Sequence, residues 1–327
     1  MPRHDARAEA LTLRPATPVR EPMTDTALSW HTEALWQQLQ PVLPGLSVEV
    51  VRSTPSTNST LLERARALPD AGDGTGSAQV RVRRSIESTA FGRRATDWAP
   101  CLLVAEQQLA GRGRQGRVWQ SQPGSSLTFS LGLGLAAGDW SGLSLAVGVA
   151  LCEALAGAAV ASSAPPRLAL KWPNDLWLMD GPGVGRKLGG ILIETVTAGA
   201  QRLAVIGVGL NVRSFDVAHA STGVASLQEI DAAATAPDVL ARVALPLVLA
   251  VKQFEREGFA AFAARYAALD LLRGHTVRTT SPDAAEGLAC GVSAQGALLL
   301  ETAAGLRCVS SGEVSVRLGA QADQPAA

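Results

Sequence analysis

The chain has 327 residues, with 29 Lys+Arg balanced by 29 Asp+Glu. A hydrophobic fraction of 47% supports a buried core and excludes disorder over most of the length. The net charge of zero gives no basic surplus for bulk nucleic-acid binding, and the longest apolar stretch, at 143–152, is too short for a membrane span.

The first predicted element is a helix over residues 27–40, which Pro41 and Pro44 end. A strand at 48–52 follows, and then a helix at 61–68 that begins with a capping box formed by Thr60 and Glu63. Residues 69–98 predict a long polar loop with several arginines. Such a loop is either functional or a lineage insertion.

The middle of the chain alternates strands with a single buried helix. Strands are predicted at 101–105 and 127–135, before a nearly all-apolar helix at 143–160. Four more strands are predicted at 168–171, 176–179, 188–195 and 203–210. Consecutive short strands with few helices between them argue against a doubly wound parallel fold.

Helical patterning returns over residues 238–271, and short strands separated by glycines fill the chain from 273 to about 317. This change in composition indicates a small all-β domain. We therefore predict a mobile extension with one short helix at 1–45, a catalytic domain at 46–272, a C-terminal domain at 273–318 and a tail at 319–327.

The cysteines and histidines show no metal-binding spacing. The four cysteines, of which three lie in apolar runs, predict buried thiols in a reducing compartment rather than disulfides. The four histidines are scattered, so no protein-bound metal site is expected.

The most informative segment is the glycine- and arginine-rich loop GRGRQGR at 111–117. Its glycines let the backbone approach a ligand closely, and its arginines suit carboxylates and phosphates. It lacks the Walker pattern of a P-loop. A solvated basic turn is the alternative.

Four further motifs are weak alone, and each has a purely structural alternative. They are Ser-Thr-Asn at 56–58, which also suits a helix N-terminus, Lys-Trp-Pro-Asn-Asp at 171–175, Arg-Lys-Leu-Gly-Gly at 186–190 and Gly-Val-Gly-Leu-Asn at 207–211. In this order, together with the loop at 111–117, they resemble the biotin protein ligases over about four-fifths of the chain. The segments 291–301 and 312–317 resemble that family's small C-terminal barrel.

The resemblance implies an α+β fold, with a central mixed β-sheet flanked by helices and a small C-terminal SH3-like β-barrel. It implies an ATP-dependent ligase that makes biotinyl-5′-AMP from biotin and ATP, with Mg²⁺ bridging the ATP phosphates. Biotin would then pass to a lysine of the biotin carboxyl carrier protein of acetyl-CoA carboxylase. The implied location is cytoplasmic, and a homodimer is left open.

The carboxylate of biotin must attack a phosphate, so cations must neutralise two anions. The predicted catalytic residues are Arg112, Arg114, Lys187 and Lys171, of which Lys171 is added from the residues rather than from the resemblance. By resemblance, the biotin-binding residues are Ser56, Thr57, Asn58, Gln108, Arg112, Gly113, Arg114, Lys187, Gly190, Gly207 and Gly209. The ATP-binding residues are Arg114, Arg117, Trp119, Asn174, Lys187 and Asn211.

Two departures from the family pattern carry expectations. Residues 1–45 are too few for the DNA-binding domain of the family's repressors, so no operator binding is expected. Some members place a Trp against adenine in the loop after Asn211, whereas Val224 is the nearest match here. A lipoate or octanoate ligase, a non-catalytic biotin sensor or DNA-binding regulator, and a nucleic-acid-binding module built on 81–94 are the alternatives.

Overall fold

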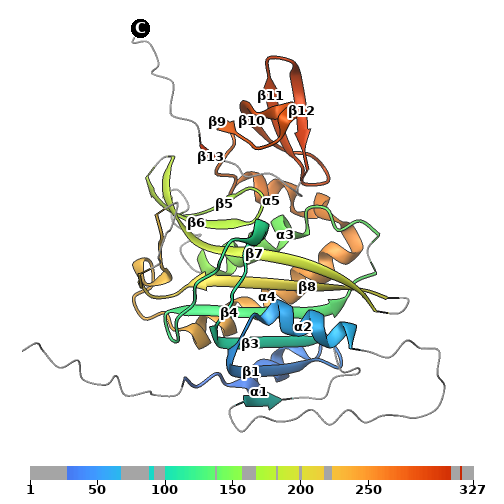
Figure 1. Cartoon of the computed structure of the whole chain (residues 1–327), viewed down its shortest axis with the longest axis vertical. Helices are drawn as coiled ribbons and strands as arrows, with labels where there is room; N and C mark the ends of the chain where they lie inside the picture. Colours follow the sequence, from blue (N-terminus) through green and yellow to red (C-terminus); the bar gives the residue numbers. More distant parts are fainter. Residues whose placement is uncertain are drawn as a thin grey trace, which may run out of the picture.

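A central eight-stranded sheet organises the computed structural model (Figure 1). The structure describes residues 28–67, 88–91, 100–136, 138–156, 167–181, 183–198, 201–216, 223–310 and 317–318. In spatial order the strands are β2 (Ser88–Phe91), β1 (Ser47–Thr54), β3 (Cys101–Gln108), β4 (Ser126–Gly134), β8 (Gln201–Asn211), β7 (Val184–Ala198), β6 (Asp175–Gly181) and β5 (Leu168–Lys171). Only β1 and β3 pair in parallel among these strands, so the predicted mixed sheet is confirmed.

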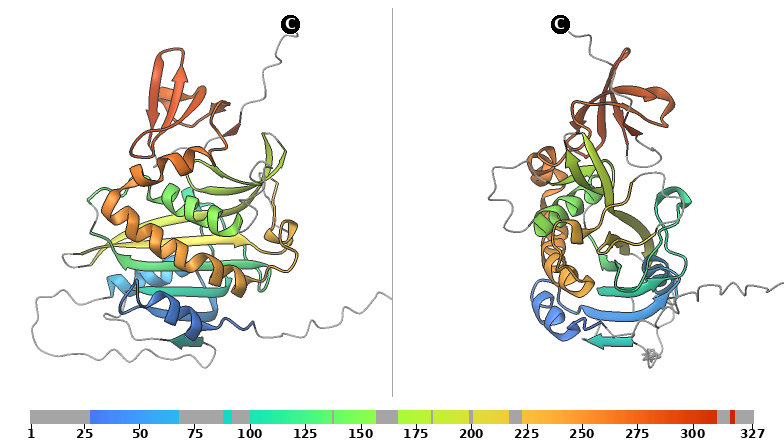
Figure 2. Two further views of the ribbon diagram at one scale, coloured as in Figure 1. Left: turned by 180° about the vertical axis from the view of Figure 1, so that it is seen from behind. Right: turned by 90° about the vertical axis from the view of Figure 1, so that its left-hand side faces the viewer.

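Helices cover the two faces of this sheet unequally. From behind, α3 (Leu143–Ala156) and the long α4 (Ala236–Glu257) cross one face (Figure 2), and their apolar side chains form the main core with the strands. The short α1 (Thr32–Leu39) packs on β1 and α4, and it contributes Leu35 and Leu39 to that core. Of the described helices, α2 (Thr57–Arg66) alone lies on the other face, which leaves the middle of the sheet accessible for a site.

Three of the predicted helical regions differ from the structure. The helix predicted at 27–40 spans only Thr32–Leu39. The helix predicted at 61–68 begins four residues earlier, because Ser56 rather than Thr60 is its N-cap and accepts a hydrogen bond from the amide of Ser59 at 3.4 Å. The helical region predicted at 238–271 is interrupted at Gly258, whose φ of 66° favours glycine. A 3-10 turn (Phe259–Phe262) and α5 (Ala263–Ala267) follow it. The predicted loop at 69–98 lies mostly outside the described residues, and its described part, Ser88–Phe91, is strand β2, paired with β1, rather than loop.

The C-terminal strands form a separate antiparallel sheet in the order β12 (Gly305–Val309), β11 (Leu298–Thr302), β10 (Glu286–Val292), β9 (Thr276–Arg278) and β13 (Arg317–Leu318). This confirms the predicted small β domain with one correction. No described pairing joins β12 to β13, so the strands form an open sheet rather than a closed barrel. The turn between β10 and β11 contacts the main domain, where the carbonyl of Gly296 accepts a hydrogen bond from Trp172 Nε1 at 2.9 Å.

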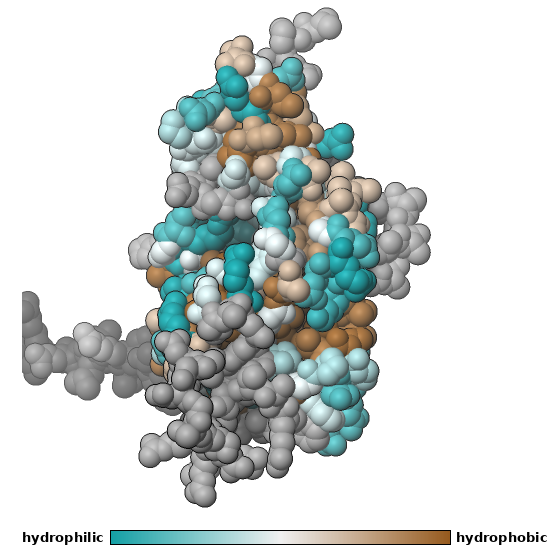
Figure 3. Space-filling model, turned by 90° about the vertical axis from the view of Figure 1, so that its right-hand side faces the viewer, coloured by the Kyte–Doolittle hydropathy of each residue, from teal (hydrophilic) through white to brown (hydrophobic). Residues whose placement is uncertain are grey.

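The outer face of the C-terminal sheet explains a second correction. Cys101 and Cys152 are buried free thiols, as predicted, but Cys290 is half-buried and Cys308 is exposed. Cys308 lies on the edge strand β12, where Leu306 is also exposed. Figure 3 shows hydrophobic side chains at the surface of this upper lobe. In a small open sheet only one face packs on a core and the other faces solvent. An apolar sequence pattern in such a sheet therefore does not imply that every apolar residue is buried.

None of the described helices combines the length and apolar character needed to cross a membrane. The predicted domain division at 45, 272 and 318 stays a prediction.

Candidate active site

The first part of the site lies where the start of α2 meets β8. Asn58 packs directly on Gly207, because a Cβ at that glycine would lie 2.3 Å from Asn58 Oδ1. Trp119 packs on Gly209 in the same way, with a closest approach of 2.5 Å to a Cβ placed there. The two glycines, which we expected to line a ligand pocket through their backbone, thus make room for two other predicted site residues.

A chain of buried polar side chains runs through this region. Gln108 Oε1 accepts hydrogen bonds from the Thr57 amide at 2.8 Å and from the Thr57 hydroxyl at 3.2 Å. The Ser130 hydroxyl on β4 lies 2.6 Å from both Thr57 Oγ1 and Asn58 Oδ1. Asn58 Nδ2 donates to Glu194 Oε2 at 2.9 Å. Because buried polar groups are costly without partners, this chain fixes the orientations of its own side chains, of which Glu194 also lines the cavity described below.

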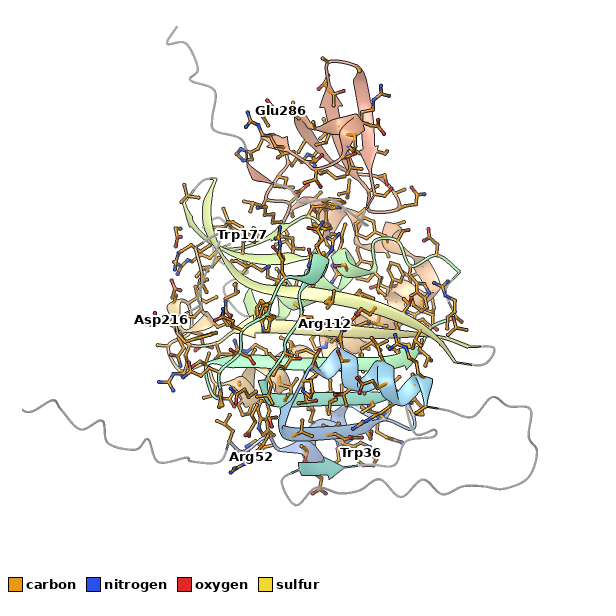
Figure 4. The ribbon with its side chains drawn as sticks, in the orientation of Figure 1. Trp36, Arg52, Arg112, Trp177, Asp216 and Glu286 are labelled. Carbon is orange, nitrogen blue, oxygen red and sulfur yellow. The ribbon has the colours of Figure 1, made fainter. Side chains whose placement is uncertain are left out.

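The Gly/Arg loop folds as a hairpin over the sheet. Its base is closed by hydrogen bonds from the Gly113 amide to the Arg117 carbonyl at 2.7 Å and from the Trp119 amide to the Gly111 carbonyl at 2.8 Å. Arg112, labelled in Figure 4, lies in front of the middle of the sheet. The hairpin shape confirms that the glycines permit a close backbone turn.

Two arginines of this loop reach the sheet through their side chains. Arg112 Nη2 donates to both carboxylate oxygens of Glu194, at 3.0 and 2.9 Å. Arg114 Nη1 donates to Asn174 Oδ1 at 3.3 Å. Burial lowers the pKa of Arg114, and the charge of Asp175 acts in the opposite direction. Arg117 is exposed.

The cation on β7 lies beside this loop. Lys187 Nζ is paired with Asp175 Oδ1 at 2.7 Å, and a Cβ at Gly190 would lie 3.6 Å from the same ammonium. Asp175 therefore acts electrostatically on both Lys187 and Arg114. The second predicted lysine, Lys171, is buried at the end of β5, with its ammonium over the Trp177 ring at 4.7 Å from the ring centroid.

A third part of the site lies at the end of β8. Asn211 is buried and donates from Nδ2 to the Ala225 carbonyl at 3.1 Å. The segment 223–226 runs beside Lys187, whose amide donates to the Gly223 carbonyl and whose carbonyl accepts from the Ala225 amide. The residue nearest the missing family Trp, Val224, forms the bridge to Lys187.

Arg186 anchors the segment 223–226 from outside. Its guanidinium pairs with Asp180 at 2.7 Å and with Glu229 at 2.6 Å, and it also donates to the Val224 carbonyl at 3.2 Å. Hydrogen bonds from Arg186 lower the pKa values of both carboxyls. The Glu229 carboxylate also accepts a hydrogen bond from the Ser226 amide at 2.8 Å. The two ends of the short turn 226–229 are therefore joined to each other, and Arg186 holds the turn through Glu229.

A cavity of about 490 Å³ lies between the loop and the C-terminal domain. Its lining includes Arg112, Arg114, Asn174, Glu194, Trp140 and Gly296. A polar cavity with convergent basic side chains is suited to an anionic ligand.

The sequence reasoning missed three residues that the structure places in the site: Ser130, Asp175 and Glu194. Ser130 carried a weak signal, because it is a polar residue inside an apolar strand. Asp175 belonged to a recognised motif but had no assigned role. One predicted residue has an additional function, because the Ser56 hydroxyl caps α2.

Comparisons with known proteins agree with this architecture. Residues 83–211 match the family model described as "Biotin/lipoate A/B protein ligase family", and residues 274–317 match that described as "Biotin protein ligase C terminal domain". A solved biotin protein ligase from Aquifex aeolicus, in complex with biotin and ATP, superposes with a TM-score of 0.62 and 25% identity. The superposition covers 83% of this chain and 99% of that one.

Two curated relatives complete the comparison. The biotin–[acetyl-CoA-carboxylase] ligase of Mycobacterium tuberculosis is 31% identical over 287 residues, which cover 85% of this chain and 89% of the relative. The bifunctional ligase/repressor BirA of Salmonella typhimurium is 35% identical over 220 residues, or 65% of this chain. The matched part spans just under two thirds, 66%, of that relative. Together with the fold and the two matched domain models, these similarities show that the chain belongs to the biotin protein ligase family.

Proposed function

We propose that the chain is an ATP-dependent biotin protein ligase. It activates biotin as biotinyl-5′-AMP and transfers biotin to a lysine of a carrier protein. The names of the relatives support this activity, as does the solved relative with biotin and ATP. The observation that carries the proposal is that Arg112 and Arg114 line one cavity, that Asp175 links Arg114 electrostatically to Lys187, and that Glu194 links Arg112 to a chain of neutral hydrogen-bonding groups.

The first step needs a neutral polar pocket next to a cationic one. Thr57, Asn58, Gln108 and the cap Ser56 supply hydroxyl and amide groups that suit a ureido ring. The biotin carboxylate then attacks the α-phosphate, a new O–P bond forms, and pyrophosphate leaves. Arg112, Arg114 and Lys187 are placed to offset the repulsion between the two anions.

The remaining predicted residues take supporting roles. Gly190 leaves space beside the Lys187 ammonium, Gly207 and Gly209 admit Asn58 and Trp119 against the sheet, and Gly113 is assigned to the loop that faces the ligand. Arg117, Trp119, Asn174 and Asn211 are assigned to the nucleotide, and Lys171 to the outer edge of the cationic region. Mg²⁺ would be carried by the ATP phosphates, and the described residues contain no cluster of three acidic, His or Cys side chains for it.

In the second step the amine of the carrier lysine attacks the carbonyl of the mixed anhydride, and AMP leaves. The acceptor we propose is the apo form of the biotin carboxyl carrier protein of acetyl-CoA carboxylase, and the proposed location is the cytoplasm. A homodimer is compatible with this scheme, and lack of operator binding stays a prediction that a gel shift with this chain tests.

The decisive experiment mixes the purified chain with ATP, Mg²⁺, biotin and an apo carrier domain, and follows the mass of the carrier. We expect a gain of one biotinyl group that depends on ATP. A parallel reaction with lipoate separates the two ligase classes. If neither acid is transferred and no adenylate forms without carrier, the proposed activity is wrong.

A further inference from the structure

Glu194 is a half-buried carboxylate in the middle of β7 that joins two parts of the site. Its oxygens accept hydrogen bonds from Arg112 Nη2 at 3.0 and 2.9 Å, and Oε2 also accepts from Asn58 Nδ2 at 2.9 Å. The exposed fractions of the Arg112 and Glu194 side chains are 44% and 25%. One acid therefore binds the loop on one side and the pocket wall on the other.

The carboxylate determines how Asn58 is oriented. An ionised carboxylate only accepts hydrogen bonds, so it selects the amide nitrogen of Asn58 and directs Oδ1 toward the Ser130 hydroxyl at 2.6 Å. The Leu192 carbonyl accepts from the same nitrogen at 3.0 Å. Glu194 and the Leu192 carbonyl are both acceptors, so together they hold the Asn58 amide in the orientation from which Ser130, Thr57 and Gln108 continue the chain.

The contact leaves much of the Arg112 guanidinium available. Both bonds to Glu194 use Nη2, so Nε and Nη1 retain donors that can face an anionic ligand. The backbone bonds of the hairpin fix its own shape but do not attach it to β7. The pair with Glu194 does attach it, because it joins residues 82 positions apart in the sequence.

We propose that Glu194 is a positioning residue for biotin: it holds Arg112 and Asn58 in register before the ligand arrives. This inference rests on the proposed ligase function. It predicts a selective effect, because Glu194 contacts the loop and the biotin wall but not the segment 223–226. Loss of the carboxylate loosens the loop and weakens biotin binding most, and it weakens ATP binding less, because the proposed nucleotide site shares Arg114, Arg117 and Trp119 of the loop but also uses Asn211 and the segment 223–226.

The test compares Glu194→Ala and Glu194→Gln with the wild-type chain. Calorimetry with biotin alone gives the Kd, and steady-state adenylation gives KM for biotin and for ATP. A charge-assisted hydrogen bond supports an expected loss of about 10-fold in biotin affinity for Glu194→Ala. Glu194→Gln keeps one acceptor oxygen, so we expect a loss of about 3-fold. The KM for ATP should rise less than the KM for biotin in both variants.

A second readout reports the loop itself. Trypsin cleaves after arginine, so we expect Glu194→Ala to be cut faster within 111–117, with the site identified by peptide mass. Glu153→Gln is the matched control, because Glu153 forms a bidentate ion pair with Arg265 on the helix-covered side of the molecule. It should leave biotin binding and loop cleavage unchanged.

The outcomes separate the two proposals. If the wild-type chain neither binds biotin nor forms adenylate, the ligase function fails. If wild type is active and Glu194→Ala binds biotin normally, the positioning role is wrong. It is also wrong if biotin and ATP weaken equally, or if Glu153→Gln has the same effect. The Glu194→Gln side chain keeps an oxygen that can accept from Asn58, so its melting temperature should equal that of wild type, which guards against a folding defect.

Discussion

The proposed biotin side and the proposed nucleotide side of this site are built in different ways. On the biotin side, Thr57, Asn58 and Ser130 are buried and joined by side-chain hydrogen bonds. On the nucleotide side, the segment 223–226 is held by backbone pairing to Lys187 and by the partly exposed ion pairs of Arg186. The side chains of the first side are fixed by hydrogen bonds to one another, whereas the segment of the second side is held by its contacts with β7 and Arg186.

This difference has an energetic consequence. A buried polar chain loses several partners when one member moves, because each unsatisfied group costs about 1–3 kcal/mol. Partly exposed ion pairs are screened by water and contribute less each. Substitutions on the biotin side should therefore act strongly and selectively, and those around Arg186 more mildly.

The largest effect is expected where the two sides meet. Lys187→Met removes the ammonium next to Asp175, and the freed carboxylate then repels the reacting anions. We expect adenylate formation, followed by pyrophosphate release, to slow by about 100–1000-fold. Lys252→Met, which removes a comparable pair with Glu255 on α4, should retain the wild-type rate. A Lys187→Met rate close to wild type would remove this residue from the chemical step.

The next prediction tests the packing of Asn58 on the sheet. Gly207→Ala places a methyl group 2.3 Å from Asn58 Oδ1 and must displace that side chain. Overpacking of this kind costs about 1–3 kcal/mol, so we expect the Kd for biotin to rise about 10–100-fold in calorimetry. Gly134→Ala on β4 is the control, because its Cβ meets Leu203 at an ordinary 3.9 Å. Equal losses in the two variants would refute the packing argument.

A milder change should affect only the nucleotide side. Arg186→Met breaks the pairs with Asp180 and Glu229 and frees the Val224 carbonyl. We expect the KM for ATP to rise about 3-fold with the KM for biotin unchanged, as measured by adenylation kinetics. Arg242→Met, which breaks an exposed pair with Asp231, serves as control. A parallel rise in both KM values would mean that the two sides are not independent.

The smallest effect lies outside both sides and concerns stability. Burial raises the pKa of Asp270 above its ordinary value of 3.8, at the connection between α5 and the C-terminal sheet. A carboxyl with a raised folded pKa favours folding while it is protonated, and this contribution is lost as pH rises through the folded pKa. The free energy of unfolding of wild type should therefore fall relative to Asp270→Asn over that pH range.

Denaturant unfolding at a series of pH values measures this difference. In the Asp270→Asn variant the side-chain amide keeps an oxygen for the Leu272 N–H, which donates to Asp270 Oδ1 at 2.9 Å in wild type, so the fold is preserved. Asp283→Asn, at an exposed position in the C-terminal domain, is the control. If the free energy of unfolding of wild type instead rises relative to Asp270→Asn with increasing pH, the proposed destabilisation by ionised Asp270 is wrong.

Local patterns along the chain are enough to predict most strands, the buried helix α3 and the motifs that carry the family resemblance, whereas the edge strand β2 lies in a region predicted as loop. These features depend on periodicity and on residue types at short spacing, which can be recognised in the sequence alone. The glycines at 207 and 209 were recognised as points of close approach for the same reason. The sequence did not predict that the groups packed on these glycines are the side chains of Asn58 and Trp119.

The choice of side-chain partners, by contrast, follows from how distant segments pack. Glu194 and Asn58 are 136 positions apart, and their contact follows from the placement of α2 on the sheet rather than from any local pattern. The open C-terminal sheet with its exposed Cys308 likewise emerges only in three dimensions, whereas the helix N-terminus at 56–58 was already one interpretation of the sequence. The physical reason is that hydrogen-bond partners and burial depend on which segments pack together, whereas turns and periodicity depend on neighbours in the chain.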